Sequence, residues 1–173
     1  MYGIRLALLL TFALPAAAQS KFEYWPGTTY DASVPTHKQI LGYDPGDRIA
    51  SPAEIVKYLE SLAAARPDRL KLREYGRTWE NRRLVYAVIG SQANIRRLDE
   101  IKEGLAKLAD PRKTSDAEAA RLTGSLPVIV WLAYGVHGNE ISSPDAGLMM
   151  AYHLLAARND KTVETFLSKV VVV

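Results

Sequence analysis

A histidine and a glutamate three residues apart form the pair with the clearest chemical potential in the chain. They lie in the run Gly135-Val136-His137-Gly138-Asn139-Glu140, directly after an apolar segment. A neutral imidazole and a carboxylate are both good zinc ligands, at about 2.0–2.2 Å from the ion. A tight loop, which Gly138 permits, would turn both side chains the same way. A catalytic zinc also needs a third protein ligand and an open position for water.

The spacing alone does not decide for metal binding. A loop histidine followed by a glutamate that interacts with the positive end of the next helix gives the same pattern. The chain has no cysteine, so a metal would be held by His, Asp or Glu. We expect His37 to be a solvated loop residue. His153, on a helix beside Met149 and Met150, is expected to be packed and structural rather than a third ligand.

The elements around the pair predict where it lies. The apolar run Leu126 to Tyr134 does not alternate with polar residues, which indicates a strand covered on both faces. A helix is expected over Pro144 to Arg158. The His137–Glu140 pair would then follow the carboxyl end of a strand, where open α/β sheets bind ligands.

Upstream, the pattern alternates between helices and strands. Ser51-Pro52-Ala53-Glu54 combines an N-cap, a proline at the first helical position and a capping-box glutamate. The further expected elements are a hairpin of Leu70–Tyr75 and Leu84–Ile89, a helix over Ile95–Leu108, a short helix after the capping box at Ser115, and a helix over Asp160–Lys169. This order predicts an α/β fold with a mixed sheet flanked by helices.

The two ends predict the domain organisation. Residues 1–18 combine Arg5, a short apolar stretch and Ala16-Ala17-Ala18, which is typical of a cleaved signal peptide and too short to span a membrane. Export to the periplasm or outside the cell is therefore expected. Residues 19–46 form an extended lead-in whose aromatic residues pack onto the domain, and residues 47–173 form the N-terminal part of a catalytic domain. Val170–Val173 looks like the start of a buried strand, so we expect a truncated domain with an exposed, association-prone edge there.

Several functions are disfavoured. The net charge is +3 with Lys and Arg scattered along the chain, which makes no electrostatic case for nucleic acid. A serine hydrolase of the α/β-hydrolase type needs a G-x-S-x-G nucleophile elbow, and the sequence has none.

Two motifs together resemble the zinc carboxypeptidase (carboxypeptidase A-like) family. Gly135 to Glu140, followed by Ile141-Ser142-Ser143-Pro144, is similar to the family's first metal-binding motif. Tyr75-Gly76-Arg77-Thr78-Trp79-Glu80-Asn81-Arg82-Arg83-Leu84 resembles its G-x-S/T-x-E-G-R hairpin, with Asn81 where glycine is usual. With the helix from Ser51, the resemblance covers about residues 46–173.

The resemblance implies a zinc-dependent carboxypeptidase that hydrolyses peptide or protein substrates with metal-activated water, and it assigns His137 and Glu140 as zinc ligands. In the family the third ligand, a catalytic glutamate and the substrate-binding arginines come later in the chain. No catalytic residue is therefore expected within residues 1–173, and this piece alone should be inactive. H-G-N-E also resembles related deacylases of N-acyl amino acids. A non-catalytic exported binding module of the same fold is a further alternative.

Overall fold

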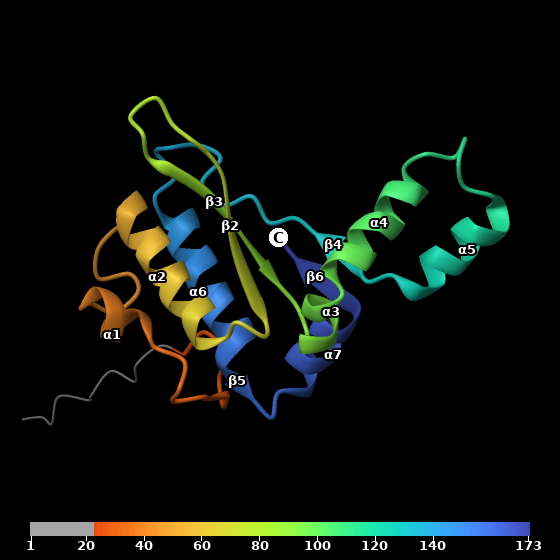
Figure 1. The fold of residues 1–173 in the computed structure, drawn as a ribbon. Coiled ribbons are helices and arrows are strands. Elements are labelled where there is room, and N and C mark those ends of the chain that lie inside the picture. Colours follow the sequence, from red (N-terminus) through yellow and green to blue (C-terminus); the bar gives the residue numbers. More distant parts are fainter. Residues whose placement is uncertain (1–22) are drawn as a thin grey trace, which may run out of the picture.

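The computed structural model describes residues 23–173 (Figure 1), so the predicted signal segment 1–18 lies outside the described residues. The helices are α1 His37–Leu41, α2 Pro52–Ala65, α3 Gln92–Arg96, α4 Leu98–Leu108, α5 Asp116–Ser125, α6 Ser142–Ala156 and α7 Lys161–Lys169. The strands are β1 Thr29–Tyr30, β2 Leu70–Arg77, β3 Arg83–Ile89, β4 Val128–Val130, β5 Ala157–Arg158 and β6 Val170–Val172.

The main sheet is mixed and has the order β2-β3-β6-β4. β2 and β3 form the predicted antiparallel hairpin, β6 runs antiparallel to β3, and β4 runs parallel to β6. The predicted α/β fold with a mixed sheet is therefore confirmed. The expected exposed edge at Val170–Val173 is wrong, because β6 lies between two strands and Val171 is only 1% exposed. Its run of valines fits that inner position, where both faces of a strand are covered.

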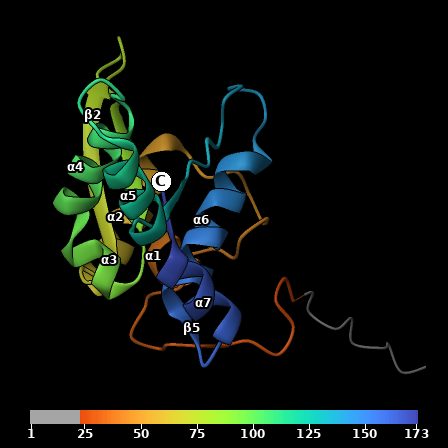
Figure 2. The same cartoon turned by 90° about the vertical axis from the view of Figure 1, so that its right-hand side faces the viewer.

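Helices α2 and α6 lie side by side against the hairpin side of the sheet (Figure 1), and the main core forms between them. Tyr58 and Leu62 of α2 and Leu148 and Leu155 of α6 are fully buried there. Helices α4 and α5 pack on each other and project away from this core (Figure 1). Figure 2 faces that side of the molecule and shows α6 apart from these two helices. The core thus anchors α6, the helix that follows the His137–Glu140 loop.

The predicted N-cap residues Ser51 and Ser115 begin helices α2 and α5. Ser51 caps α2 with the full capping box, since its side chain accepts from the Glu54 amide and the Glu54 carboxylate accepts from the Ser51 amide at 2.9 Å. Ser115 caps α5 through its own side chain. The single helix expected over residues 95–108 is instead two helices with a break at Arg97, whose amide bonds Asn94 O three residues back.

The lead-in is more ordered than its composition suggested. Thr36 and Gln39 form a capping box that starts the short helix α1. His37 is in this helix and only 6% exposed, and its Nδ1 lies 2.9 Å from Tyr43 O. The expectation of a solvated loop histidine is therefore wrong, because one helical turn is too short to show a periodicity in the sequence.

The lead-in aromatics do pack onto the domain as predicted, and they meet His153. Trp25 stacks on the His153 ring at 4.0 Å between centroids, and the Tyr30 hydroxyl lies 3.1 Å from His153 Nδ1. His153 is therefore buried and structural, as expected, although its ring partners come from the lead-in.

Among the described residues, no helix is long and apolar enough to cross a membrane.

Candidate metal site

The strand that leads to the site is shorter and more open than predicted. Of the apolar run 126–134, only Val128–Val130 forms strand β4. The chain continues alongside β6, with the Leu132 amide donating to Val173 O at 2.8 Å. The expected coverage on both faces is wrong, because the side chain of Val128 in β4 is 62% exposed and that of Trp131, directly after the strand, is 66% exposed. Face coverage depends on which elements pack on the sheet, and the apolar pattern does not report this.

The loop from β4 to α6 turns at Gly135. This residue has φ of 74°, the left-handed conformation that favours glycine, and its amide donates to Ser143 Oγ at 3.0 Å. A Cβ at position 135 would also lie 3.2 Å from Pro144 Cγ. Gly138, which was expected to allow the tight loop, has no positive φ and open space around it. Gly135 therefore provides the turn.

The structure brings His137 and Glu140 together. His137 Nδ1 lies 2.8 Å from Glu140 Oε1, and the Glu140 amide donates to His137 O at 3.1 Å. The two side chains are 68% and 57% exposed, so both donor groups are accessible from solvent. The turn of backbone between the two residues holds them on the same side of the loop.

The pair fits two ligands of a single zinc ion. Two donors at zinc distances and at a tetrahedral angle are about 3.3 Å apart, so the observed pair would open by about half an ångström to hold the ion. Within residues 23–173, no group of three or more His, Asp or Glu side chains could hold a metal ion. His37 and His153 are buried in contacts of their own. His137 and Glu140 thus bring two donor groups together, whereas a catalytic zinc requires three protein ligands.

Aromatic side chains from several elements gather near the end of β4. Tyr86 of β3 lies between Tyr75 of β2 and Trp131, with ring centroids 6.0 and 6.3 Å apart. These rings and Val136 line a largely apolar cavity of about 480 Å³ between the hairpin, the end of β4 and α6. Sequence reasoning missed this cluster, because contacts between strands depend on their register.

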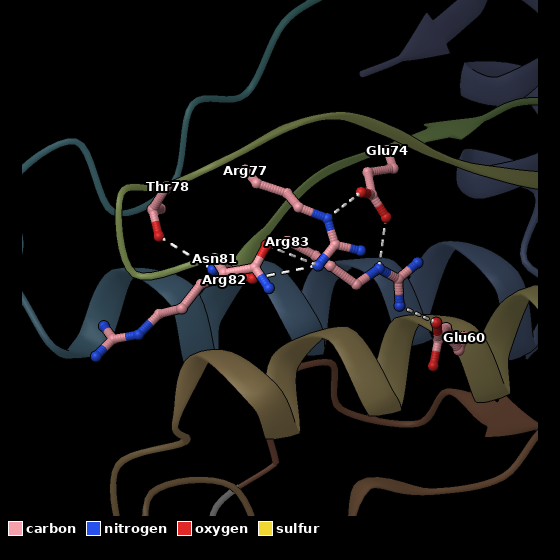
Figure 3. A network of polar contacts seen from close by, with 7 residues as sticks. All are labelled: Glu60, Glu74, Arg77, Thr78, Asn81, Arg82 and Arg83. Carbon is pink, nitrogen blue, oxygen red and sulfur yellow. Dashed lines mark hydrogen bonds and ion pairs between the residues drawn. The ribbon is translucent and has the colours of Figure 1, made fainter.

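The hairpin that resembles the family motif carries a network of ion pairs and hydrogen bonds between side chains (Figure 3). Asn81 has φ of 61°, so asparagine takes the left-handed position for which the family usually has glycine. Arg83 reaches Glu74 at 2.7 Å and also binds Glu60 of α2. The Arg83 guanidinium holds the pKa of the Glu74 carboxyl below its ordinary value. Within this network the Arg83–Glu60 ion pair joins the hairpin to α2.

The loop after β4 therefore places a histidine and a carboxylate, both of the kind that bind zinc, where open α/β sheets bind ligands. Comparison of the sequence with models of known protein families identifies a family for this chain. The family model described as zinc carboxypeptidase matches residues 55–173, and the chain belongs to this family. No curated protein and no solved structure matches the chain.

Proposed function

We propose that this protein is a zinc-dependent carboxypeptidase in which His137 and Glu140 are two of the zinc ligands. The proposal rests on one observation, the 2.8 Å approach of His137 Nδ1 to Glu140 Oε1 in the loop after β4 of a chain of this family. When bound, zinc activates water and polarises the scissile carbonyl. His137 and Glu140 hold the ion and do not transfer protons.

The remaining groups are proposed to come from outside residues 23–173. These are the third ligand and the carboxylate that accepts the proton of the attacking water. The described residues alone would bind zinc weakly, because two ligands leave the ion under-coordinated. We therefore expect residues 19–173 alone to show no peptidase activity. A protein that also supplies the third ligand and the base, called the full-length protein below, should be active.

The substrate class is proposed to be peptides, as the family implies. A blocked dipeptide and an N-acyl amino acid, assayed side by side, separate the carboxypeptidase from the deacylase. Turnover of the N-acyl amino acid alone would replace the peptidase proposal, and turnover of neither substrate by a zinc-loaded protein would favour a binding module.

We further propose that the protein is exported and that residues 1–18 are removed. The support is the order of charged, apolar and small residues in that segment. Mass spectrometry of protein recovered from outside the cytoplasm should find an N-terminus at or next to Gln19. A cytoplasmic protein that retains residues 1–18 would refute the proposal.

Removal of each ligand tests the metal assignment. In the full-length protein, His137→Ala and Glu140→Ala should lose both bound zinc and turnover. Without zinc, both variants should unfold like the zinc-free wild type, because the side chains are more than half exposed. Glu118→Ala is the matched control, since Glu118 pairs with Arg121 on the distant helix α5. Activity that resists a chelator, or a Glu140→Ala protein with full zinc and full rate, would exclude this mechanism.

A further inference from the structure

Helix α6 carries a glycine on the side that meets the metal-binding loop. Gly147 is within the helix, where glycine is among the least favourable residues and alanine the most favourable. A helical glycine in such a position indicates that something approaches the backbone closely. The neighbour is the ring of Tyr134, the residue directly before Gly135.

The fit between the two residues leaves no space for a methyl group. A Cβ at position 147 would lie 2.9 Å from Tyr134 Cδ2 and 3.0 Å from Cγ. Cγ is the base of the ring rather than a flexible end, so the whole ring would have to move. Tyr134 is also only three residues before His137. The ring can clear the methyl by turning about its χ1 bond or by moving with its backbone, and the second route displaces the beginning of the loop.

Two further contacts hold the same loop to the same helix. The Gly135 amide donates to Ser143 Oγ at 3.0 Å, and Gly135 Cα lies against Pro144 closely enough that a Cβ would approach Cγ to 3.2 Å. Ser143, Pro144 and Gly147 lie on the first two turns of α6. The loop is thus fixed to one short stretch of helix, on the N-terminal side of His137.

We propose that Tyr134, seated against Gly147, is a positioning residue that sets where the loop presents His137 and Glu140 to zinc. The inference rests on the metal site proposed above. In this role Tyr134 would act through the backbone of residues 134–137 and not as a ligand. Groups that orient metal ligands typically change metal affinity about 10- to 100-fold when they are removed.

A double-mutant cycle in the full-length protein tests this coupling. Gly147→Ala should weaken zinc binding about tenfold or more, measured by competition with a fluorescent chelator. Tyr134→Ala should weaken it by a similar factor, because the loop loses its support. In the double variant the effect of Gly147→Ala should disappear, since there is no ring left to displace. Hydrogen exchange of the Gly135 amide in the zinc-free protein should be faster in Gly147→Ala than in the wild type.

Two other glycine variants serve as controls. Gly124→Ala adds a methyl to helix α5 in open space and should leave zinc affinity and Gly135 exchange unchanged. Gly104→Ala creates a contact of the same distance on helix α4, 2.9 Å to Leu126 Cδ1, and should also leave zinc affinity and Gly135 exchange unchanged.

The outcomes separate this inference from the proposed function. A wild-type protein that binds no zinc would overturn the metal site and the positioning role together. A zinc-binding wild type with an unaffected Gly147→Ala variant would overturn the positioning role alone. So would a Gly147→Ala effect that persists undiminished in the Tyr134→Ala background.

Discussion

A buried amide links helix α3 to the chain just before the inner strand β6. Asn94 is 3% exposed, and its Nδ2 donates to Leu167 O and Ser168 O, both at 3.2 Å. These carbonyls are at the end of α7, where the last turn of a helix leaves acceptors without partners in the helix. Replacement of Asn94 by alanine should therefore destabilise the fold measurably.

The contacts give the size of the effect. The variant loses three hydrogen bonds. The two that Nδ2 donates are each worth about 0.5–1.5 kcal/mol net. The third is the long bond of 3.4 Å that Arg97 Nη2 donates to Asn94 Oδ1, and it adds less. Leu167 O keeps a second donor, the Ser91 amide at 3.2 Å, so the penalty for an unpaired carbonyl falls mainly on Ser168 O. We expect Asn94→Ala to lower the free energy of unfolding by about 2 kcal/mol.

Urea unfolding followed by tryptophan fluorescence measures this change, with the midpoint shifted and the slope unchanged. Gln92→Ala is the matched control, because Gln92 is exposed on the same helix, and it should change stability by less than about 0.5 kcal/mol. If Asn94→Ala unfolds within error of Gln92→Ala, the two hydrogen bonds do not stabilise the fold as argued.

Two further predictions concern the core and the lead-in. Leu155 is fully buried in the core around α2 and α6, so Leu155→Ala should cost about 2–5 kcal/mol in urea unfolding, and a loss below 1 kcal/mol would show that this core is loosely packed. Burial lowers the pKa of His153 below its ordinary 6.5, against a weaker opposing effect of Asp160. The neutral ring therefore contributes stability that is present above about pH 6.5 and is lost as the pH falls through the folded-state pKa. Thermal unfolding at about pH 7.5 and pH 5 should show a smaller pH effect in His153→Gln than in the wild type, and equal effects would contradict this assignment.

The sequence predicted the features that depend on neighbouring residues. The capping box at Ser51 and Glu54, the hairpin and the helix after Pro144 are local patterns, and each is present in the structure. The His137–Glu140 approach was also predictable, because three residues and one turn of loop suffice to bring the side chains together. The family resemblance added what spacing could not, and the match over residues 55–173 confirms it.

The features that were missed depend on residues far apart in the chain. The exposure of Trp131 and the burial of Val171 depend on which distant elements pack against each side chain. His37 was misassigned for a related reason, since its edge-on contact with Tyr58 joins α1 to α2. Hydrophobic patterns report that a residue is apolar, whereas long-range packing decides which apolar surface is covered.

The candidate site depends both on local sequence and on long-range packing. The local sequence points to His137 and Glu140, whereas the contacts that hold their loop in place come from residues far apart in the chain. His137 and Glu140 meet through local backbone, but the direction in which the loop leaves the sheet is set by β4, which is paired with β6. The direction of α6, which receives the loop, is set by its packing on α2. Tyr134 lies where these two constraints meet, because it follows the strand and contacts the helix at Gly147. The geometry of the metal pair is therefore a property of the folded core as well as of the motif.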